Sequence, residues 1–120
     1  MKKLKEFVRF DDKKFMNGKT FVFKDAKPYS ADNGEQGYKF DLLIEKDNTE
    51  YTNPEDKYIN ELEVMTIKMP NATQDYVQMF KRRSPVNVEI IKTTPYVKTV
   101  GNFSTIEVSF KGNVKLINRQ

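Results

Sequence analysis

The chain has 120 residues, with 21 lysines and arginines against 17 aspartates and glutamates, and it contains neither histidine nor cysteine. The length fits one domain over 1–120. The missing residue types exclude Ser–His–Asp and Cys–His nucleophiles, disulfides and thiolate metal sites. Carboxylates such as Glu61 and Glu63 could form an acid pair or a Mg²⁺ or Ca²⁺ site, but they are interpreted as surface acids, so we expect no enzyme, no metal and no cofactor. The sequence has no apolar run near the roughly 18 residues of a membrane-spanning helix, and a cytoplasmic protein without a membrane contact is expected.

Alternating apolar and polar residues predict strands through most of the chain, over 4–10, 19–24, 38–46, 61–69, 86–92, 103–111 and 114–118. In 61–69 the face with Leu62 and Val64 is as apolar as the face with Met65, which predicts a strand covered on both sides. Gly112-Asn113 is typical of a tight turn between the last two strands. The stretch 92–103 is expected to be the connection between 86–92 and 103–111.

One segment, 71–84, has the pattern of a helix, expected over about 72–83. Asn71 or Thr73 can cap its start. An apolar stripe follows at roughly helical spacing, made of Tyr76, Val77, Met79 and Phe80. Cations suit the last turn of a helix, and this turn would hold Lys81, Arg82 and Arg83 before Pro85 ends the helix.

The fold class expected from this order is mostly β: a small OB-like barrel of five to seven strands, with one helix over an opening. The predicted helix falls between the strands 61–69 and 86–92, as it does between the third and fourth strands of OB-like barrels. An α+β sandwich, with the helix packed on one sheet face, is the alternative.

Charge is distributed unevenly along the chain. Residues 81–120 hold 8 lysines and arginines against 2 acids, whereas residues 1–80 hold 13 against 15. A one-sided basic surface favours polyanions, although an ordinary solvated surface explains the charge equally well. The acidic span 45–63 would repel DNA, so we expect it to face away from such a surface or to dock a partner. Its carboxylates are interpreted as surface acids.

Proteins that bind single-stranded nucleic acid combine a basic groove with aromatic side chains on which bases stack. In the last third of this chain, lysines flank Tyr96 and Phe103. Packing of Tyr96 at the barrel rim is the competing interpretation. The candidate nucleic-acid-binding residues are Lys81, Arg82, Arg83, Lys92, Tyr96, Lys98, Phe103 and Lys111.

A resemblance to a known family lies in three segments: YKFDLLIEK over 38–46, VMTIKMP over 64–70 and the stretch 86–118. In these segments the chain resembles small accessory proteins of conjugative transposons and plasmids of Gram-positive bacteria. That family includes a helicase-processivity protein, and the resemblance covers about 36–118. The chain has Lys92-Thr93-Thr94-Pro95 where the family tends to have Asn-Pro, and its predicted helix is longer. The resemblance implies an OB-like barrel that acts in replication or transfer of mobile DNA.

The sequence therefore supports a non-enzymatic single-stranded DNA-binding accessory protein of a mobile genetic element, which would work beside a helicase or another replication protein. The alternative is a protein-interaction or structural module of a phage or conjugation system, docking a partner through the span 45–63 or an edge strand. A barrel that binds RNA is a third possibility.

Overall fold

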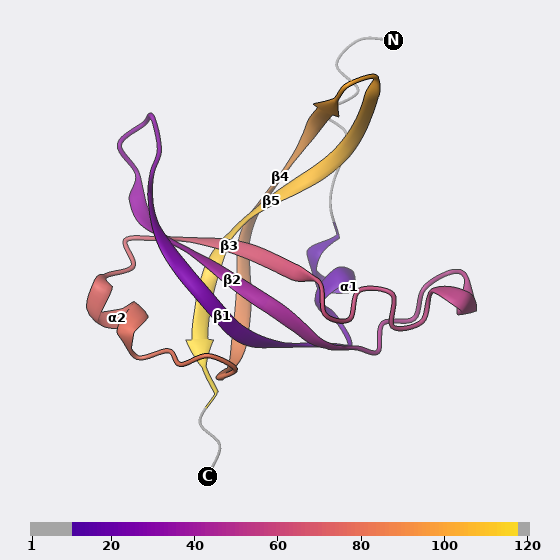
Figure 1. Ribbon diagram of the computed structural model, residues 1–120, viewed down its shortest axis with the longest axis horizontal. Helices are drawn as coiled ribbons and strands as arrows, with labels where there is room; N and C mark the ends of the chain where they lie inside the picture. Colours follow the sequence, from indigo (N-terminus) through magenta and orange to yellow (C-terminus); the bar gives the residue numbers. More distant parts are fainter. Residues whose placement is uncertain (1–10, 118–120) are drawn as a thin grey trace.

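The computed structural model describes residues 11–117, which form five strands and three short helical segments. The strands are β1 (Lys19–Ser30), β2 (Gln36–Asp47), β3 (Val64–Pro70), β4 (Pro85–Val100) and β5 (Phe103–Leu116). They form a single sheet that closes on itself in the order β1-β2-β3-β5-β4 (Figure 1). Neighbouring strands are antiparallel except for the parallel pair β3–β5. The prediction of a mostly β chain is confirmed.

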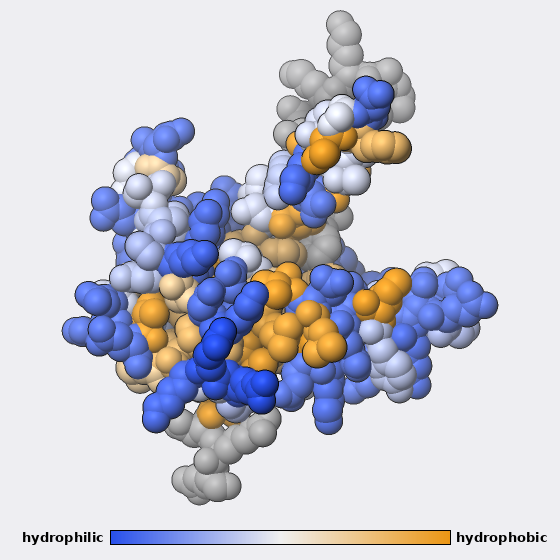
Figure 2. All heavy atoms as spheres, viewed as in Figure 1, coloured by the Kyte–Doolittle hydropathy of each residue, from blue (hydrophilic) through white to orange (hydrophobic). Residues whose placement is uncertain are grey.

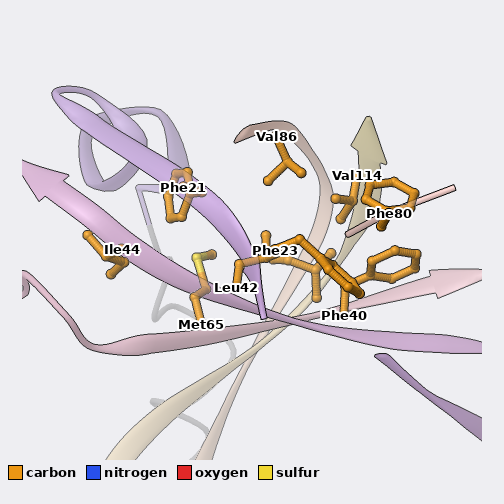
Figure 3. Close-up of a cluster of buried hydrophobic side chains, with 10 residues drawn as sticks. Phe21, Phe23, Phe40, Leu42, Ile44, Met65, Phe80, Val86 and Val114 are labelled. Atoms are coloured by element: carbon orange, nitrogen blue, oxygen red, sulfur yellow. The ribbon is translucent and has the colours of Figure 1, made fainter. Parts of the chain in front are cut away.

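The core fills the inside of this ring, because successive side chains of a strand point to opposite faces. In β2, Phe40, Leu42 and Ile44 are buried, as the alternation predicts. Phe21, Phe23, Phe40 and Phe80 are buried in this core (Figure 3). Phe110 packs against it. The buried cluster contains Phe21, Phe23, Phe40, Leu42, Ile44, Met65, Ile67, Phe80, Val86 and Val114.

The predicted helix is much shorter than expected. Helix α2 spans Gln74–Gln78, and its N-cap is Thr73, whose side chain accepts a hydrogen bond from the N–H of Tyr76. The chain leaves helical geometry because its next backbone groups pair with β1: the N–H of Arg83 donates to the carbonyl of Phe23 at 2.8 Å. Phe80 is buried, but Met79 is 60% exposed, so the apolar stripe is only partly correct.

The basic turn, which we define as Lys81, Arg82 and Arg83, therefore does not lie in the last turn of a helix. All three side chains are exposed in the turn that leads from α2 to β4. Their predicted interaction with the helix dipole is wrong for this reason.

The stretch 92–103 is not a loop. It forms the outer part of a long hairpin in which β4 and β5 pair up to Val100 and Phe103, with the turn at Gly101 and Asn102 (Figure 1). Gly112-Asn113 is not a turn either, since both residues lie inside β5. Gly112 is required there for another reason: a Cβ would lie 2.1 Å from the carbonyl oxygen of Glu89.

A register shift between Ile90 and Lys92 marks a β-bulge in β4, close to Gly112. A bulge adds one residue to one strand, so the alternation of faces changes there. Val88 and Ile90 point into the ring before the bulge, and beyond it the partner of inward-facing Phe110 is Thr93. The outward face of the hairpin therefore carries Lys92 and the even-numbered residues that follow it.

Two helical segments lie outside the strand pattern. Helix α1 (Asp12–Met16), which the sequence pattern does not predict, packs Phe15 against Phe110, with ring centroids 6.1 Å apart. The 3-10 helix η2 (Pro54–Asp56) lies in the connection between β2 and β3. The strand predicted over 4–10 lies outside the described residues. Within 11–117, no helix has the length and apolar character that a membrane span requires.

The outer face of β3 is open, which contradicts the prediction that both faces are covered. Met65 and Ile67 are buried in the ring, whereas Val64 is 45% exposed. Leu62, just before the strand, is 73% exposed. Apolar residues on both faces of this strand thus do not reflect burial on both faces.

Candidate nucleic-acid interface

One lysine from every strand lies in a continuous row across the outer face of the ring. Lys27 of β1 pairs with Lys39 of β2, and Lys39 pairs with Lys68 of β3. Lys68 pairs with Lys111 of β5, which pairs with Lys92 of β4. Directly opposed residues share a face, so these five side chains, the lysine row, lie side by side across the strands.

The strand alternation places the row outside the core. The residues next to these lysines, among them Ala26, Phe40, Ile67 and Phe110, belong to the core cluster or pack against it. Lys27, Lys39 and Lys92 are exposed, and Lys68 and Lys111 are half-buried. With strands about 4.8 Å apart, the four steps give the row a path length of about 19 Å around the ring.

Two hairpins flank the row. The β1–β2 hairpin and the β4–β5 hairpin project from the same side of the ring (Figure 1). At the first hairpin, Glu35 forms a salt bridge of 2.8 Å with Lys111, and Tyr29 donates a hydrogen bond to Glu35 at 3.3 Å. Lys68 lies over the Tyr29 ring, 5.8 Å from its centroid. These contacts tie the β1–β2 hairpin to the row.

The hydrogen bond from Lys111 lowers the pKa of Glu35, and burial together with Glu35 raises the pKa of Tyr29. Glu35 therefore stays ionised at neutral pH, where it neutralises part of the charge of Lys111 and Lys68. A phosphate at Lys111 would compete with this carboxylate.

The β4–β5 hairpin brings most of the predicted site residues onto one face. Tyr96 pairs with Glu107, Lys98 with Thr105, and Phe103 with Val100. Because β4 residues with even numbers pair with β5 residues with odd numbers beyond the bulge, one face carries Lys92, Tyr96, Lys98, Phe103 and Lys111. This face continues the outer face of the ring and therefore begins at the lysine row.

Both predicted aromatics on this face are accessible. Tyr96 is 41% exposed and Phe103 is 80% exposed. Rim packing, the competing interpretation of Tyr96, accounts for more than half of its surface, but its exposed part still lies on the hairpin face. An exposed aromatic ring beside lysines is the combination that accepts stacked bases.

Acidic residues limit the basic surface on two sides. Asp25 pairs with Asp41 in the next outward-facing row of β1 and β2, and Thr66 donates a hydrogen bond of 2.6 Å to Asp41. On the hairpin, Glu107 lies opposite Tyr96. A polyanion would therefore follow the lysine row across the strands rather than spread over the whole outer face.

The basic turn does not join this arrangement. Arg82 and Arg83 line a different hollow, together with Val22, Leu43 and Val64. Along β1 and β2, the Asp25–Asp41 pair lies between the residues that line this hollow, Val22 and Leu43, and the lysines of the row, Lys27 and Lys39. The structure thus groups five of the eight predicted residues and leaves Lys81, Arg82 and Arg83 apart.

Sequence reasoning missed Lys27, Lys39 and Lys68. They belong to the first 80 residues, where acids outnumber lysines and arginines, so the charge distribution along the chain conceals them. The strand pattern alone predicts that each of these lysines points outward, because each lies on the polar face of its strand. Aligning them required the register of the strand pairs.

The acidic span 45–63 is partly structural. Asp47 is fully buried and forms an ion pair with Lys19, with an Nζ to Oδ1 distance of 3.5 Å. Tyr51 donates a hydrogen bond of 2.6 Å to Asp47, and the N–H of Asn60 donates another of 3.2 Å. The interpretation of Asp47 as a surface acid is wrong, because these contacts fasten the segment after β2 to the ring.

The protonation of this pair follows from its surroundings. Burial alone would raise the pKa of Asp47, but hydrogen bonds from Tyr51, Thr49 and Asn60 lower it to about 2. Burial lowers the pKa of Lys19, an effect that Asp47 opposes. Asp47 is therefore a charged, fully engaged side chain rather than a docking residue.

Among residues 11–117, no three acidic side chains gather as ligands for a metal ion. Comparison of the whole chain with protein-family models, curated proteins and solved structures found no match. The arrangement of the lysine row and the hairpin face is therefore the basis for a functional proposal.

Proposed function

We propose that this protein binds single-stranded DNA without sequence preference, along the lysine row and the adjoining face of the β4–β5 hairpin. The observation that carries the proposal is the row itself: one lysine from each of five strands, joined by direct cross-strand pairing. Lysines at this spacing offer a line of positive charge to a chain of phosphates, and binding would release the counterions of that chain.

Folding alone does not favour such a row. Like charges placed directly opposite each other on neighbouring strands destabilise a sheet. Glu35 offsets part of the repulsion at Lys111. In the part of the chain that the structure describes, Lys27 and Lys39 have no salt bridge to an acid, and Lys68 interacts with Glu35 at longer range without a salt bridge. A bound polyanion would supply the missing negative charge.

Exposed aromatics favour a single strand over a duplex. Tyr96 and Phe103 lie on the hairpin face that begins at the row, and unpaired bases can stack on such rings whatever their sequence. The stacked bases of a duplex do not offer their faces in this way. The lysines would neutralise phosphates and the two aromatics would hold bases.

The strand order supports an OB-like barrel. The order β1-β2-β3-β5-β4, the parallel β3–β5 pair and a helix between β3 and β4 are features of that class, whose strand 2–3 face and flanking loops bind oligonucleotides. A role in replication or transfer of a mobile element, beside a helicase in the cytoplasm, rests on the family resemblance in 36–118 and is part of the same proposal.

The test is titration of a fluorescein-labelled dT oligonucleotide with the full chain at 50 and 200 mM salt. Micromolar or tighter binding at the lower salt, weakened at the higher, supports the proposal. Competition with unlabelled oligo-U and with a DNA duplex distinguishes an RNA preference and a duplex preference. Absence of binding at 50 mM salt refutes the proposal and favours the protein-interaction alternative.

A further inference from the structure

The outer face of the ring carries a second row, this one apolar. Val22 of β1 pairs with Leu43 of β2, and Leu43 pairs with Val64 of β3. Leu62, just before β3, extends the row, and these four residues line a hollow of about 390 Å³, which we call the apolar hollow. Figure 2 shows hydrophobic atoms at the centre of this face.

Two residues that line the apolar hollow have an unusual backbone geometry. Leu62 and Arg83 have φ angles of 69° and 68°, in the left-handed region that bulky residues rarely adopt. Backbone hydrogen bonds fix both: the N–H of Leu62 donates to Ile44 and that of Arg83 to Phe23, each at 2.8 Å. Strain of this kind collects at binding sites, and here one of the two strained residues is apolar and the other is cationic.

The charges at the apolar hollow have one sign. Lys24, Arg82 and Arg83 line it, and no acidic side chain is among the described residues that line it. In Figure 2 strongly hydrophilic side chains lie beside the central hydrophobic patch. Arginine binds carboxylates through two parallel hydrogen bonds, so this rim is complementary to aspartate and glutamate.

The composition of the hollow argues against a nucleic acid as its occupant. Its accessible apolar side chains are aliphatic, whereas bases require aromatic or planar groups for stacking. The one aromatic that lines it, Phe23, is 7% exposed and belongs to the core. Phosphate alone would use the rim and leave Leu62 and Val64 in water.

We propose that the apolar hollow is a docking site for a short acidic peptide segment of a partner protein, which inserts a large apolar side chain between Leu62 and Val64. Its carboxylates pair with Lys24, Arg82 and Arg83. This site is separate from the lysine row, and it gives Arg82 and Arg83 a role that the nucleic-acid interface does not. One molecule would thereby hold DNA and a partner at different places.

The probe is a fluorescein-labelled octapeptide with a central Leu-Phe pair and aspartates on both sides, measured by fluorescence anisotropy against the full chain. We expect saturable binding with a Kd below about 1 mM. Arg82→Glu should weaken it by roughly tenfold or more, and Leu62→Ser should weaken it by at least roughly threefold.

Two matched variants serve as controls. Lys81→Glu changes a charge in the basic turn and is matched to Arg82→Glu. Ile59→Ser removes an exposed apolar side chain from the connection between β2 and β3 and is matched to Leu62→Ser. Neither Lys81 nor Ile59 lines the hollow. Both should keep the wild-type Kd within about twofold, below the effects of the variants in the hollow. Thermal unfolding of each variant shows that it is folded, and because the substituted side chains are exposed, their midpoints should be close to the wild-type value.

Several outcomes overturn the proposal. One is absence of binding up to about 1 mM; another is equal binding of a peptide whose Leu-Phe pair is replaced by serines. Displacement of the peptide by a dT oligonucleotide would assign the hollow to phosphate. A dimer in sedimentation equilibrium that Leu62→Ser dissociates would assign it to a second copy of the chain. Failure of DNA binding by the wild type leaves this proposal intact, so the two proposals fail separately.

Discussion

Removing the lysines of β1, β2 and β3 from the lysine row should lower the salt dependence of DNA binding by an amount that the structure sets. The variant is the triple substitution Lys27→Gln, Lys39→Gln and Lys68→Gln. These residues lie on the outer face, opposite to the core side of their strands, so the fold should persist. Lys92 and Lys111 remain, which keeps part of the interface.

The magnitude follows from the number of phosphates contacted. Each phosphate neutralised on a single strand contributes about −0.7 to the slope of log K against log salt. If each of the three lysines contacts one phosphate, the triple variant loses about 2 from that slope. Between 50 and 200 mM salt, these contacts account for a roughly twentyfold change in affinity, which the triple variant should no longer show.

The assay is the dT titration at four or more salt concentrations, with far-UV circular dichroism to confirm the fold. The matched control is Lys13→Gln, Lys46→Gln and Lys57→Gln, which removes the same net charge from exposed positions outside the row. An equal loss of slope in the control would show that net charge matters and the row does not. An unchanged slope in the row variant would refute the reasoning directly.

Four further predictions concern the pair Lys19–Asp47, the glycine at the bulge and the hairpin face. Asp47→Ala leaves Lys19 buried without its carboxylate, and urea denaturation should show a loss of about 3–5 kcal/mol; a loss below about 1 kcal/mol would contradict the role of the pair. Since the pKa of Asp47 falls from 3.8 to about 2 on folding, its stabilisation is complete above the higher value and is lost as the pH falls toward the lower one; thermal scans of wild type and Asp47→Asn should converge in that range. Gly112→Ala should cost more than about 2 kcal/mol because the Cβ has no room beside Glu89, and wild-type stability in urea would disprove the contact. Phe103→Ala should weaken dT binding by about 1–3 kcal/mol at an unchanged melting temperature, while Ile106→Ala, on the other hairpin face, should bind like wild type.

The sequence predicted the inner faces of the strands well, because alternation directly reflects which side chains meet the core, but it placed a loop at 92–103 and a turn at Gly112-Asn113 where β4 and β5 continue. The faces of β2 and the burial of Phe21, Phe23 and Phe40 follow from period-two patterning alone. The extent of α2 could not be predicted in this way. Its end depends on Arg83 and Ser84 pairing with Phe23, which is about 60 residues earlier in the chain.

The candidate site was predictable only in part, since strand register is a tertiary property. Tyr96, Lys98 and Phe103 could be grouped because they lie close together in the sequence. Lys27, Lys39 and Lys68 could not be joined to them without knowing which residues oppose each other in β1, β2 and β3. A glycine such as Gly112 shows the same limit: it looks like a turn residue, but it makes room for a neighbouring backbone.

The β-bulge at Ile91 makes the function of the β4–β5 hairpin depend on chain length rather than on composition alone. With the extra residue, Lys92, Tyr96 and Lys98 continue the outer face, while Pro95 and Val97 continue the inner one. A chain lacking one residue here would keep almost the same composition, yet its cationic and apolar hairpin faces would exchange places. We therefore expect insertions and deletions in this part of β4 to be tolerated less well than most substitutions of its exposed side chains.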